Sequence, residues 1–176
     1  LNINSHGPLP WPKGDSLKFA FVGRLEWIKG LDLAIEVLRS AEWRERDWRL
    51  DVYGSGELQP ELEAQVSTLG LSDRICFRGF ASDIDSVWRE HHVLLLASRA
   101  EGVPNSMLEA MLCGRPVVVS NVGGISAWVR DGETGYIVAQ PDIPTLAATM
   151  ERLWSDRNGL ETMGSAAYER TFLLRD

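Results

Sequence analysis

The chain has 176 residues, of which 44% are hydrophobic and 24% charged, with a formal net charge of −7 and a pI of about 5.0. This is the composition of a soluble globular domain, and its acidic balance argues against a nucleic-acid-binding or lipid-binding surface. The sequence has no membrane-span-sized apolar run and no signal-peptide pattern, and its two cysteines are too few for a disulfide framework or zinc site, so we expect a cytoplasmic protein.

Strands and helices are predicted to alternate from Leu17 onward. The preceding segment, Asn2–Gly14, is rich in proline and glycine and is interpreted as an irregular linker outside the core. Short apolar strands are expected at Leu17–Val22, Arg49–Tyr53, Ile75–Phe77, Val93–Ala97, Val117–Ser120 and Tyr136–Val138. Helices are expected at Gly30–Arg39, Pro60–Leu69, Ile84–Glu90, Ser106–Cys113, Thr145–Leu153 and from Leu160 to about Phe172.

This alternation predicts one α/β domain, in which a parallel sheet of about six strands carries helices on both faces. Ligands of such sheets bind at the carboxyl ends of the strands. The loops that follow the strands are therefore the places where functional residues are expected.

The loop after the first predicted strand holds two cations. Arg24 and Lys29 stand five positions apart between Gly23 and Gly30, where a strand leads into a helix. A helix N-terminus adds backbone amides and the positive end of its dipole, so this loop could bind a phosphate. The alternative is a solvated loop in which Arg24 pairs with Glu26.

The loop after the second strand, Gly54-Ser55-Gly56, begins like a dinucleotide-binding fingerprint. Gln59 stands where the third glycine belongs, so a structural turn is favoured and a dehydrogenase is the weakest interpretation.

The loop after the fourth strand contains a stronger signal. Pro104 and Asn105 mark a helix start, and Gly102 allows a ligand to approach the backbone closely. The first amides of that helix form a second candidate anion site. Glu101 lies in the loop, and Glu109 lies among apolar helix residues. The Glu109 carboxylate could accept hydrogen bonds from sugar hydroxyls, or it could have no role.

Other polar residues are interpreted as structural. Asp83 and Asp85 have the form of an acidic metal-binding pair, but helix capping is favoured at this predicted helix start. His91 and His92 lack acidic or cysteine partners at ligand spacing. No nucleophile–base arrangement stands out, and neither a metal nor a cofactor is expected.

Several motifs together resemble a known family. The run from Glu101 to Val118, with seven residues between Glu101 and Glu109, is similar to the signature of the group 1 retaining glycosyltransferases. Further pieces agree in order and spacing: Gly23-Arg24-Leu25 with Lys29-Gly30, Val52-Tyr53-Gly54-Ser55-Gly56, Phe77-Arg78-Gly79-Phe80, Val122-Gly123-Gly124 and Asp131-Gly132-Glu133-Thr134-Gly135. The resemblance covers nearly all of residues 17–153. It implies the Rossmann-like C-terminal half of a GT-B fold.

The resemblance also implies roles. Arg24 and Lys29 would hold the diphosphate of a nucleoside-diphosphate sugar, Glu109 the ribose, and Glu101 the donor sugar. Arg24, Lys29 and Glu101 are thus the catalytic candidates. The remaining donor-binding candidates are Gly23, Gly54, Arg78, Gly79, Phe80, Gly102, Val103, Pro104, Asn105, Ser106, Met107 and Glu109.

The chain departs from the family pattern in three ways. Ala127 stands where a glutamate is common, and Trp27 is unusual between the two cations. We expect the N-terminal acceptor-binding domain of the family to be absent from this chain, residues 1–15 to be an interdomain linker and residues 16–176 to be the donor-binding domain. Any membrane association is expected to come through the N-terminal domain. A nucleotide-sugar epimerase of related fold and a non-catalytic sugar-nucleotide-binding module remain alternatives.

Overall fold

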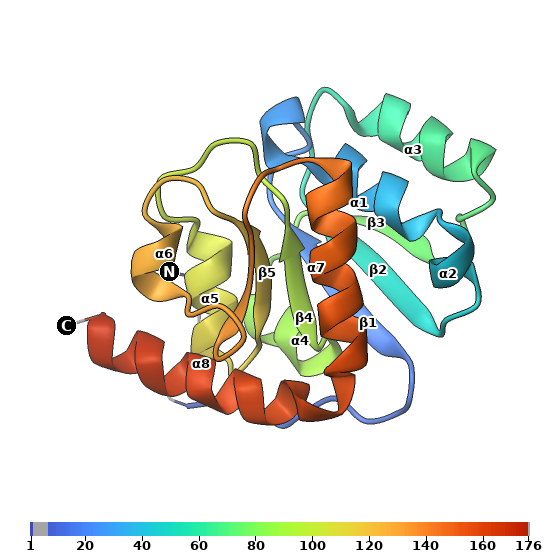
Figure 1. Cartoon of the computed structure of the whole chain (residues 1–176). Helices are drawn as coiled ribbons and strands as arrows, with labels where there is room; N and C mark the ends of the chain where they lie inside the picture. The colour runs from blue at the N-terminus through green and yellow to red at the C-terminus, as the bar shows by residue number, and fades with distance from the viewer. Residues whose placement is uncertain (2–6, 176) are drawn as a thin grey trace.

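The computed structural model describes residues 1 and 7–175 and shows one α/β domain (Figure 1). Its described part contains a six-stranded parallel sheet with the order β3-β2-β1-β4-β5-β6. The strands are β1 (Leu17–Val22), β2 (Trp48–Tyr53), β3 (Ile75–Gly79), β4 (Val93–Leu96), β5 (Val117–Ser120) and β6 (Gly135–Val138). The predicted fold class and the six predicted strands are confirmed, with boundaries that differ by at most two residues.

Helices cover both faces of the sheet. Helix α1 packs against α7, and α5 packs against α8 on the opposite face. The helices are α1 (Leu31–Leu38), α2 (Ala41–Arg44), α3 (Gln59–Thr68), α4 (Ile84–Glu90), α5 (Asn105–Leu112), α6 (Ile125–Trp128), α7 (Ile143–Ser155) and α8 (Leu160–Leu174), with 3-10 turns η1 (Trp27–Lys29) and η2 (Arg157–Gly159). Within the described residues, no helix combines the length and apolar character that crossing a membrane requires.

Burial explains the sequence pattern of the strands. Every residue of β4 and β5 is buried, as expected for central strands of a parallel sheet with helices on both faces. Strand β2 lies nearer the edge and alternates buried with more exposed residues. It begins at Trp48, one residue earlier than predicted, because Trp48 pairs with Leu17 of β1 and its indole N–H donates to the Trp43 carbonyl at 2.8 Å.

The N-terminal segment contradicts one expectation. Leu9 belongs to the hydrophobic core, although Asn2–Gly14 was predicted to lie outside it. The amide of Leu9 donates to the Cys113 carbonyl at 3.1 Å, and the buried Arg115 guanidinium donates to the Leu9 and Pro10 carbonyls at 3.2 and 2.7 Å. These backbone bonds hold the chain on the domain despite its proline-rich composition. Residues 2–6 of this segment lie outside the described residues.

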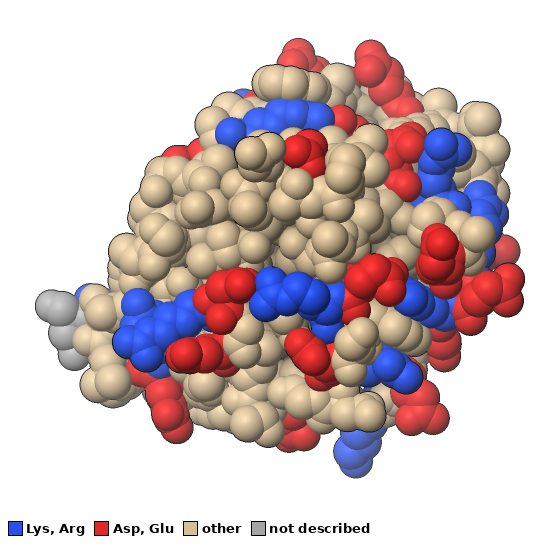
Figure 2. Space-filling view, viewed as in Figure 1, with Lys and Arg blue, Asp and Glu red and all other residues tan. Residues whose placement is uncertain are grey.

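Two short helices were not predicted. Helices α2 and α6 have four residues each, too few for a 3.6-residue apolar period to be recognised. Figure 2 shows that basic side chains on the viewed face lie among acidic ones, mainly in a band across its middle.

The strand order creates the place for a site. Strand β1 has β2 on one side and β4 on the other, so the chain reverses its direction of travel across the sheet at this point. The loops that follow β1 and β4 lead to helices on opposite faces and separate from each other, which opens a crevice at the carboxyl ends of the strands.

Candidate functional site

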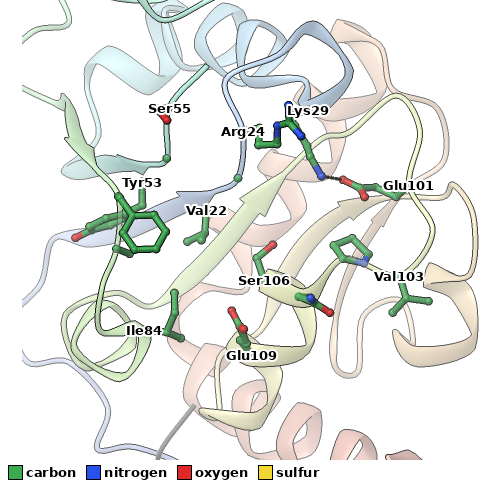
Figure 3. Close-up of a pocket in the computed structure, with 16 residues that line it drawn as sticks. Val22, Arg24, Lys29, Tyr53, Ser55, Ile84, Glu101, Val103, Ser106 and Glu109 are labelled. Carbon is green, nitrogen blue, oxygen red and sulfur yellow. Dashed lines mark hydrogen bonds and ion pairs between the residues drawn. The ribbon is translucent and has the colours of Figure 1, made fainter. Parts of the chain in front are cut away.

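A cleft of about 520 Å³ occupies this crevice (Figure 3). Its walls come from the loops after β1, β2, β3 and β4 and from the first turns of α4 and α5. The lining residues are Val22, Gly23, Arg24, Lys29, Tyr53, Gly54, Ser55, Phe80, Ala81, Ile84, Glu101, Val103, Pro104, Asn105, Ser106 and Glu109. Most of the residues that the sequence singled out thus lie together, although they span 87 positions of the chain (Gly23 to Glu109).

The two predicted cations occupy different environments. Arg24 is 77% exposed and pairs with Glu26 at 2.6 Å, which is the alternative that the sequence left open. An exposed pair of this kind contributes at most about 1 kcal/mol, so a multiply charged anion in the cleft could replace Glu26. Lys29 is 21% exposed and reaches across the cleft mouth.

Lys29 and Glu101 join the two sides of the cleft. The Lys29 ammonium lies 2.5 Å from the Glu101 carboxylate, which also accepts a hydrogen bond from the buried Ser98 hydroxyl at 2.9 Å. The Glu101 side chain is 9% exposed, and Ser98 is fully buried. An ammonium has three donors, so Lys29 can keep its bond to Glu101 and still donate to an anion.

The first turn of α5 supplies backbone amides. Asn105 and Ser106 line the cleft, and within the described chain their amides donate no hydrogen bond to a protein group. Met107 differs from its expected role, because its amide donates to the Pro104 carbonyl at 3.1 Å and its side chain is buried in the core. Among the described residues, the amides of this turn that donate to no protein group are therefore those of Asn105 and Ser106.

Glu109 lies one turn further along α5. It lines the cleft below Ser106, although it is only 6% exposed. Its neighbours in the helix, including Ala110 and Met111, face the core. A mostly buried carboxylate at the floor of a cleft can accept hydrogen bonds from hydroxyl groups of a bound molecule.

Glycines allow the cleft loops to pack closely. Gly54 has a φ of +128°, and a Cβ there would lie 1.8 Å from the Gly23 carbonyl oxygen. Gly123, with a φ of +57°, places its α-carbon against the Glu101 carbonyl, which a Cβ would approach to 2.0 Å. The Gly124 amide then donates to the Gly102 carbonyl at 3.0 Å. The loop after β5 thus supports the loop that carries Glu101.

The wall opposite α5 is apolar and aromatic. Tyr53, Ile84 and the 83% exposed Phe80 form it. Burial, followed by the nearby Asp51 charge, raises the pKa of Tyr53 to about 12. The nearby Gly79 ends β3 and accepts a hydrogen bond from the Gly54 amide at 2.8 Å.

Arg78 points elsewhere. Its guanidinium pairs with Asp51 at 2.8 Å, and the same carboxylate contacts the buried His91 ring at 2.8 Å. Burial alone would raise the pKa of Asp51, but the hydrogen bonds from His91 and Arg78 bring it below its ordinary value. The Arg78 side chain is therefore not part of the cleft lining, and any contact of residues 78–80 with a ligand would come from Phe80 and the backbone.

The polar residues outside the cleft have structural partners. Asp83 caps α4, as predicted: its carboxylate accepts from the Ser86 amide and also from the Ser86 hydroxyl, the latter at 2.6 Å. His92 accepts from the Lys18 amide at 3.0 Å and lies 3.2 Å from the Pro12 carbonyl. Residues 1 and 7–175 contain no group of three or more side chains placed to hold a metal ion.

The sequence missed five lining residues, namely Val22, Tyr53, Ser55, Ala81 and Ile84. Each lies next to a motif that was recognised. Their positions at or just beyond the ends of parallel strands could have placed them in the cleft, because such residues share one edge of the sheet.

Comparison with known proteins identifies the family. The model of the family described as glycosyl transferases group 1 matches residues 16–156. The chain belongs to the group 1 glycosyl transferases. It is 34% identical to an alpha-D-kanosaminyltransferase of Streptomyces kanamyceticus over 84% of this chain and 39% of that protein. It is 37% identical to a D-inositol 3-phosphate glycosyltransferase of Mycobacterium sp. (strain KMS) over 85% of this chain and 34% of that protein. The chain thus spans well under half the length of these relatives.

Solved glycosyltransferase structures have the same fold. The Anabaena protein HepE, in complex with UDP and glucose, aligns with a TM-score of 0.80 at 26% identity, over 90% of this chain and 44% of that one. The sucrose-phosphate synthase of Thermosynechococcus elongatus aligns with a TM-score of 0.80 at 27% identity, over 91% of this chain and 41% of that one. The fold therefore matches the Rossmann-like C-terminal domain of GT-B glycosyltransferases.

Proposed function

We propose that the cleft binds a nucleoside-diphosphate sugar, and that the chain is the donor-binding part of a retaining glycosyltransferase that transfers a hexosyl group. The observation that carries this proposal is the meeting of two cations, two helix-start amides and two carboxylates in one cleft. The first four groups match a diphosphate, and the carboxylates match the hydroxyls of ribose and of a sugar.

Different residues of the cleft would contact different parts of the donor. The diphosphate would lie between Lys29, Arg24 and the first turn of α5. The ribose would lie on Glu109, one helical turn deeper, and the base would lie along the Tyr53–Phe80 wall. Glu101, beside Lys29 at the cleft mouth, would then face the sugar and the scissile bond.

Catalysis would come chiefly from charge stabilisation. As the glycosidic bond breaks, negative charge grows on the leaving diphosphate, and donors already in place stabilise it without reorganisation. Lys29, Arg24 and the α5 amides could do this without a metal ion. The acceptor would be supplied across a cleft formed with an N-terminal domain, whose closure would exclude water. We expect a cytoplasmic protein, with any membrane contact made by that other domain.

A ligand panel tests donor binding. A molecule that binds only the folded state raises the apparent stability of the protein. We expect UDP, the nucleotide in the HepE complex, or another nucleoside diphosphate to raise the melting temperature in the presence of EDTA, and one nucleotide sugar to raise it further. Failure of every nucleotide and nucleotide sugar to bind, or binding only with added manganese or magnesium, would contradict the proposal.

Activity measurements distinguish a glycosyltransferase from a non-catalytic sugar-nucleotide-binding module. If the acceptor site lies in another domain, this chain should bind donor and show little turnover alone. Addition of the N-terminal domain should restore transfer. Donor binding that never leads to transfer in the full-length protein would favour the binding-module alternative.

A further inference from the structure

The residues that fix the cleft mouth include an arginine that does not line the cleft. Arg99 follows β4 and is 16% exposed. Its guanidinium donates to both carboxylate oxygens of Asp32, at 2.9 and 2.7 Å, and to the Trp27 carbonyl at 2.5 Å. Asp32 lies in the first turn of α1, and Trp27 begins the 3-10 turn that ends at Lys29. One side chain thus joins the loop after β4 to both sides of the Lys29 turn.

Backbone contacts extend this connection. The Arg99 amide donates to the Ile28 carbonyl at 2.7 Å, and the Arg99 guanidinium lies 4.2 Å from the centroid of the Trp27 ring. Gly30 packs so closely on the chain just after β4 that a Cβ there would lie 1.9 Å from the Ala97 carbonyl oxygen. These contacts hold the turn from Trp27 to Gly30 against the chain that follows β4.

Lys29 needs such support, because its turn has little of its own. None of the three residues of η1 is buried, and Trp27 and Ile28 are 63% and 39% exposed. A single 3-10 turn has only weak internal hydrogen bonds. The core therefore does not fix this turn, and the contacts with Arg99 supply the fixed geometry.

We propose that Arg99 and Asp32 are positioning residues, which hold the Trp27–Lys29 turn so that Lys29 meets Glu101 and the diphosphate at a fixed place. This inference rests on the proposed function for its ligand. Arg99 acts through Lys29 and does not touch the donor, since its guanidinium is directed to Asp32 and Trp27 and is absent from the cleft wall. The proposal also gives a role to Trp27, which is unusual between the two cations, because its ring covers the Arg99 guanidinium.

The direction in which one substitution changes diphosphate binding distinguishes this positioning role from a simple effect of charge. Asp32→Asn removes a negative charge near the cleft, and on charge alone it should strengthen the binding of a diphosphate. If Asp32 holds Arg99 in place, the same substitution should weaken binding, as Arg99→Ala does. Arg99→Lys keeps the charge but loses the planar guanidinium that spans the carboxylate. Its affinity for the diphosphate should therefore lie between those of Arg99→Ala and wild type.

The matched control is Arg46, which forms the same kind of contact far from the cleft. It donates to both carboxylate oxygens of Glu151 at 2.6 and 2.8 Å and stacks on Trp43. Arg46→Ala therefore removes a forked arginine–carboxylate pair and an aromatic contact without touching the cleft. It reports what general loss of stability does to each measurement.

The first measurement needs no ligand. Hydrogen exchange followed by mass spectrometry should show faster exchange of the amides of residues 26–30 in Arg99→Ala than in wild type. These include the Lys29 and Gly30 amides, which donate to the Glu26 and Trp27 carbonyls. Arg46→Ala should leave this segment unchanged. Unchanged exchange in Arg99→Ala would overturn the inference whether or not the protein binds a nucleotide.

The second measurement is calorimetric titration with UDP, well below the melting temperature of every variant. We expect Arg99→Ala and Asp32→Asn to raise the dissociation constant by about fivefold to tenfold, and Arg46→Ala to leave it unchanged. In a Lys29→Ala background, Arg99→Ala should have little further effect, because it acts through Lys29. Full additivity, or tighter binding by Asp32→Asn, would overturn the inference, whereas failure of the wild-type chain to bind any nucleotide would count against the proposed function alone.

Discussion

Two arginines at opposite edges of the sheet have opposite environments. At the amino edge, Arg115 is 1% exposed and its guanidinium donates to backbone carbonyls all around it, those of Leu9, Pro10, Trp88, His91, Cys113 and Gly114. At the carboxyl edge, Arg24 is 77% exposed and, among the described residues, pairs with Glu26 alone. A cation whose nitrogens all donate to protein carbonyls serves the fold, and a cation with unused donors is available to a ligand.

The largest difference between the edges should appear in stability. Arg115→Ala would leave several buried carbonyls without a donor, so we expect the free energy of unfolding to fall by about 3–5 kcal/mol. Arg24→Ala should change it by less than about 1 kcal/mol, because the Arg24–Glu26 pair is exposed. Urea unfolding of both variants measures this. An Arg115→Ala variant as stable as Arg24→Ala would remove the distinction between the two edges.

A second effect at the amino edge depends on pH. Burial, offset in part by the Pro12 carbonyl, lowers the pKa of His92 to about 4, whereas an unfolded histidine titrates near 6.5. As the pH falls, the unfolded state therefore binds a proton before the folded state does, and this favours unfolding. The contribution of neutral His92 to the free energy of unfolding is complete above pH 6.5, and about 3 kcal/mol of it is lost as the pH falls to 4. Urea unfolding between pH 7 and 4 should show this loss. His92→Gln, which cannot titrate, should show a smaller loss, and an equal loss in this variant would assign it to other groups.

The sequence located the carboxyl edge better than it described the amino edge. Apolar runs gave the strands, and strand ends gave the loops, so Arg24, Lys29, Glu101 and Glu109 were expected at one site before any contact was known. The role of Leu9 in the core was missed, because a proline-rich segment carries no periodicity and is held by backbone bonds to Arg115.

Contacts between distant residues could not be predicted. The Lys29–Glu101 pair joins residues 72 positions apart, and the Arg78–Asp51 pair depends on the register of β2 and β3. The Met107 amide was expected to be free, but the turn at Pro104 already bonds it. These details follow from how the loops pack, which no local pattern encodes.

At the carboxyl edge, the two cleft carboxylates should respond differently. Glu109→Ala should weaken the binding of UDP and of the nucleotide sugar alike, by about 1.5–3 kcal/mol each, because both ligands carry the ribose. Glu101→Gln should weaken only the nucleotide sugar. It should leave UDP binding unchanged or tighter, since it releases Lys29 from an ion pair. Titration of both ligands tests this, and an equal loss of both in Glu101→Gln would refute the division of roles.

The most direct test of the account is the affinity of the cleft cations for the diphosphate. Titration calorimetry would compare UDP with uridine, or the corresponding pair for the base that the panel selects, in wild type, Arg24→Ala and Lys29→Ala. We expect each substitution to weaken UDP binding by about tenfold, or 1.4 kcal/mol, to reduce its salt dependence and to leave the nucleoside affinity unchanged. Folded variants that keep wild-type affinity for UDP would show that the phosphate site lies on another loop.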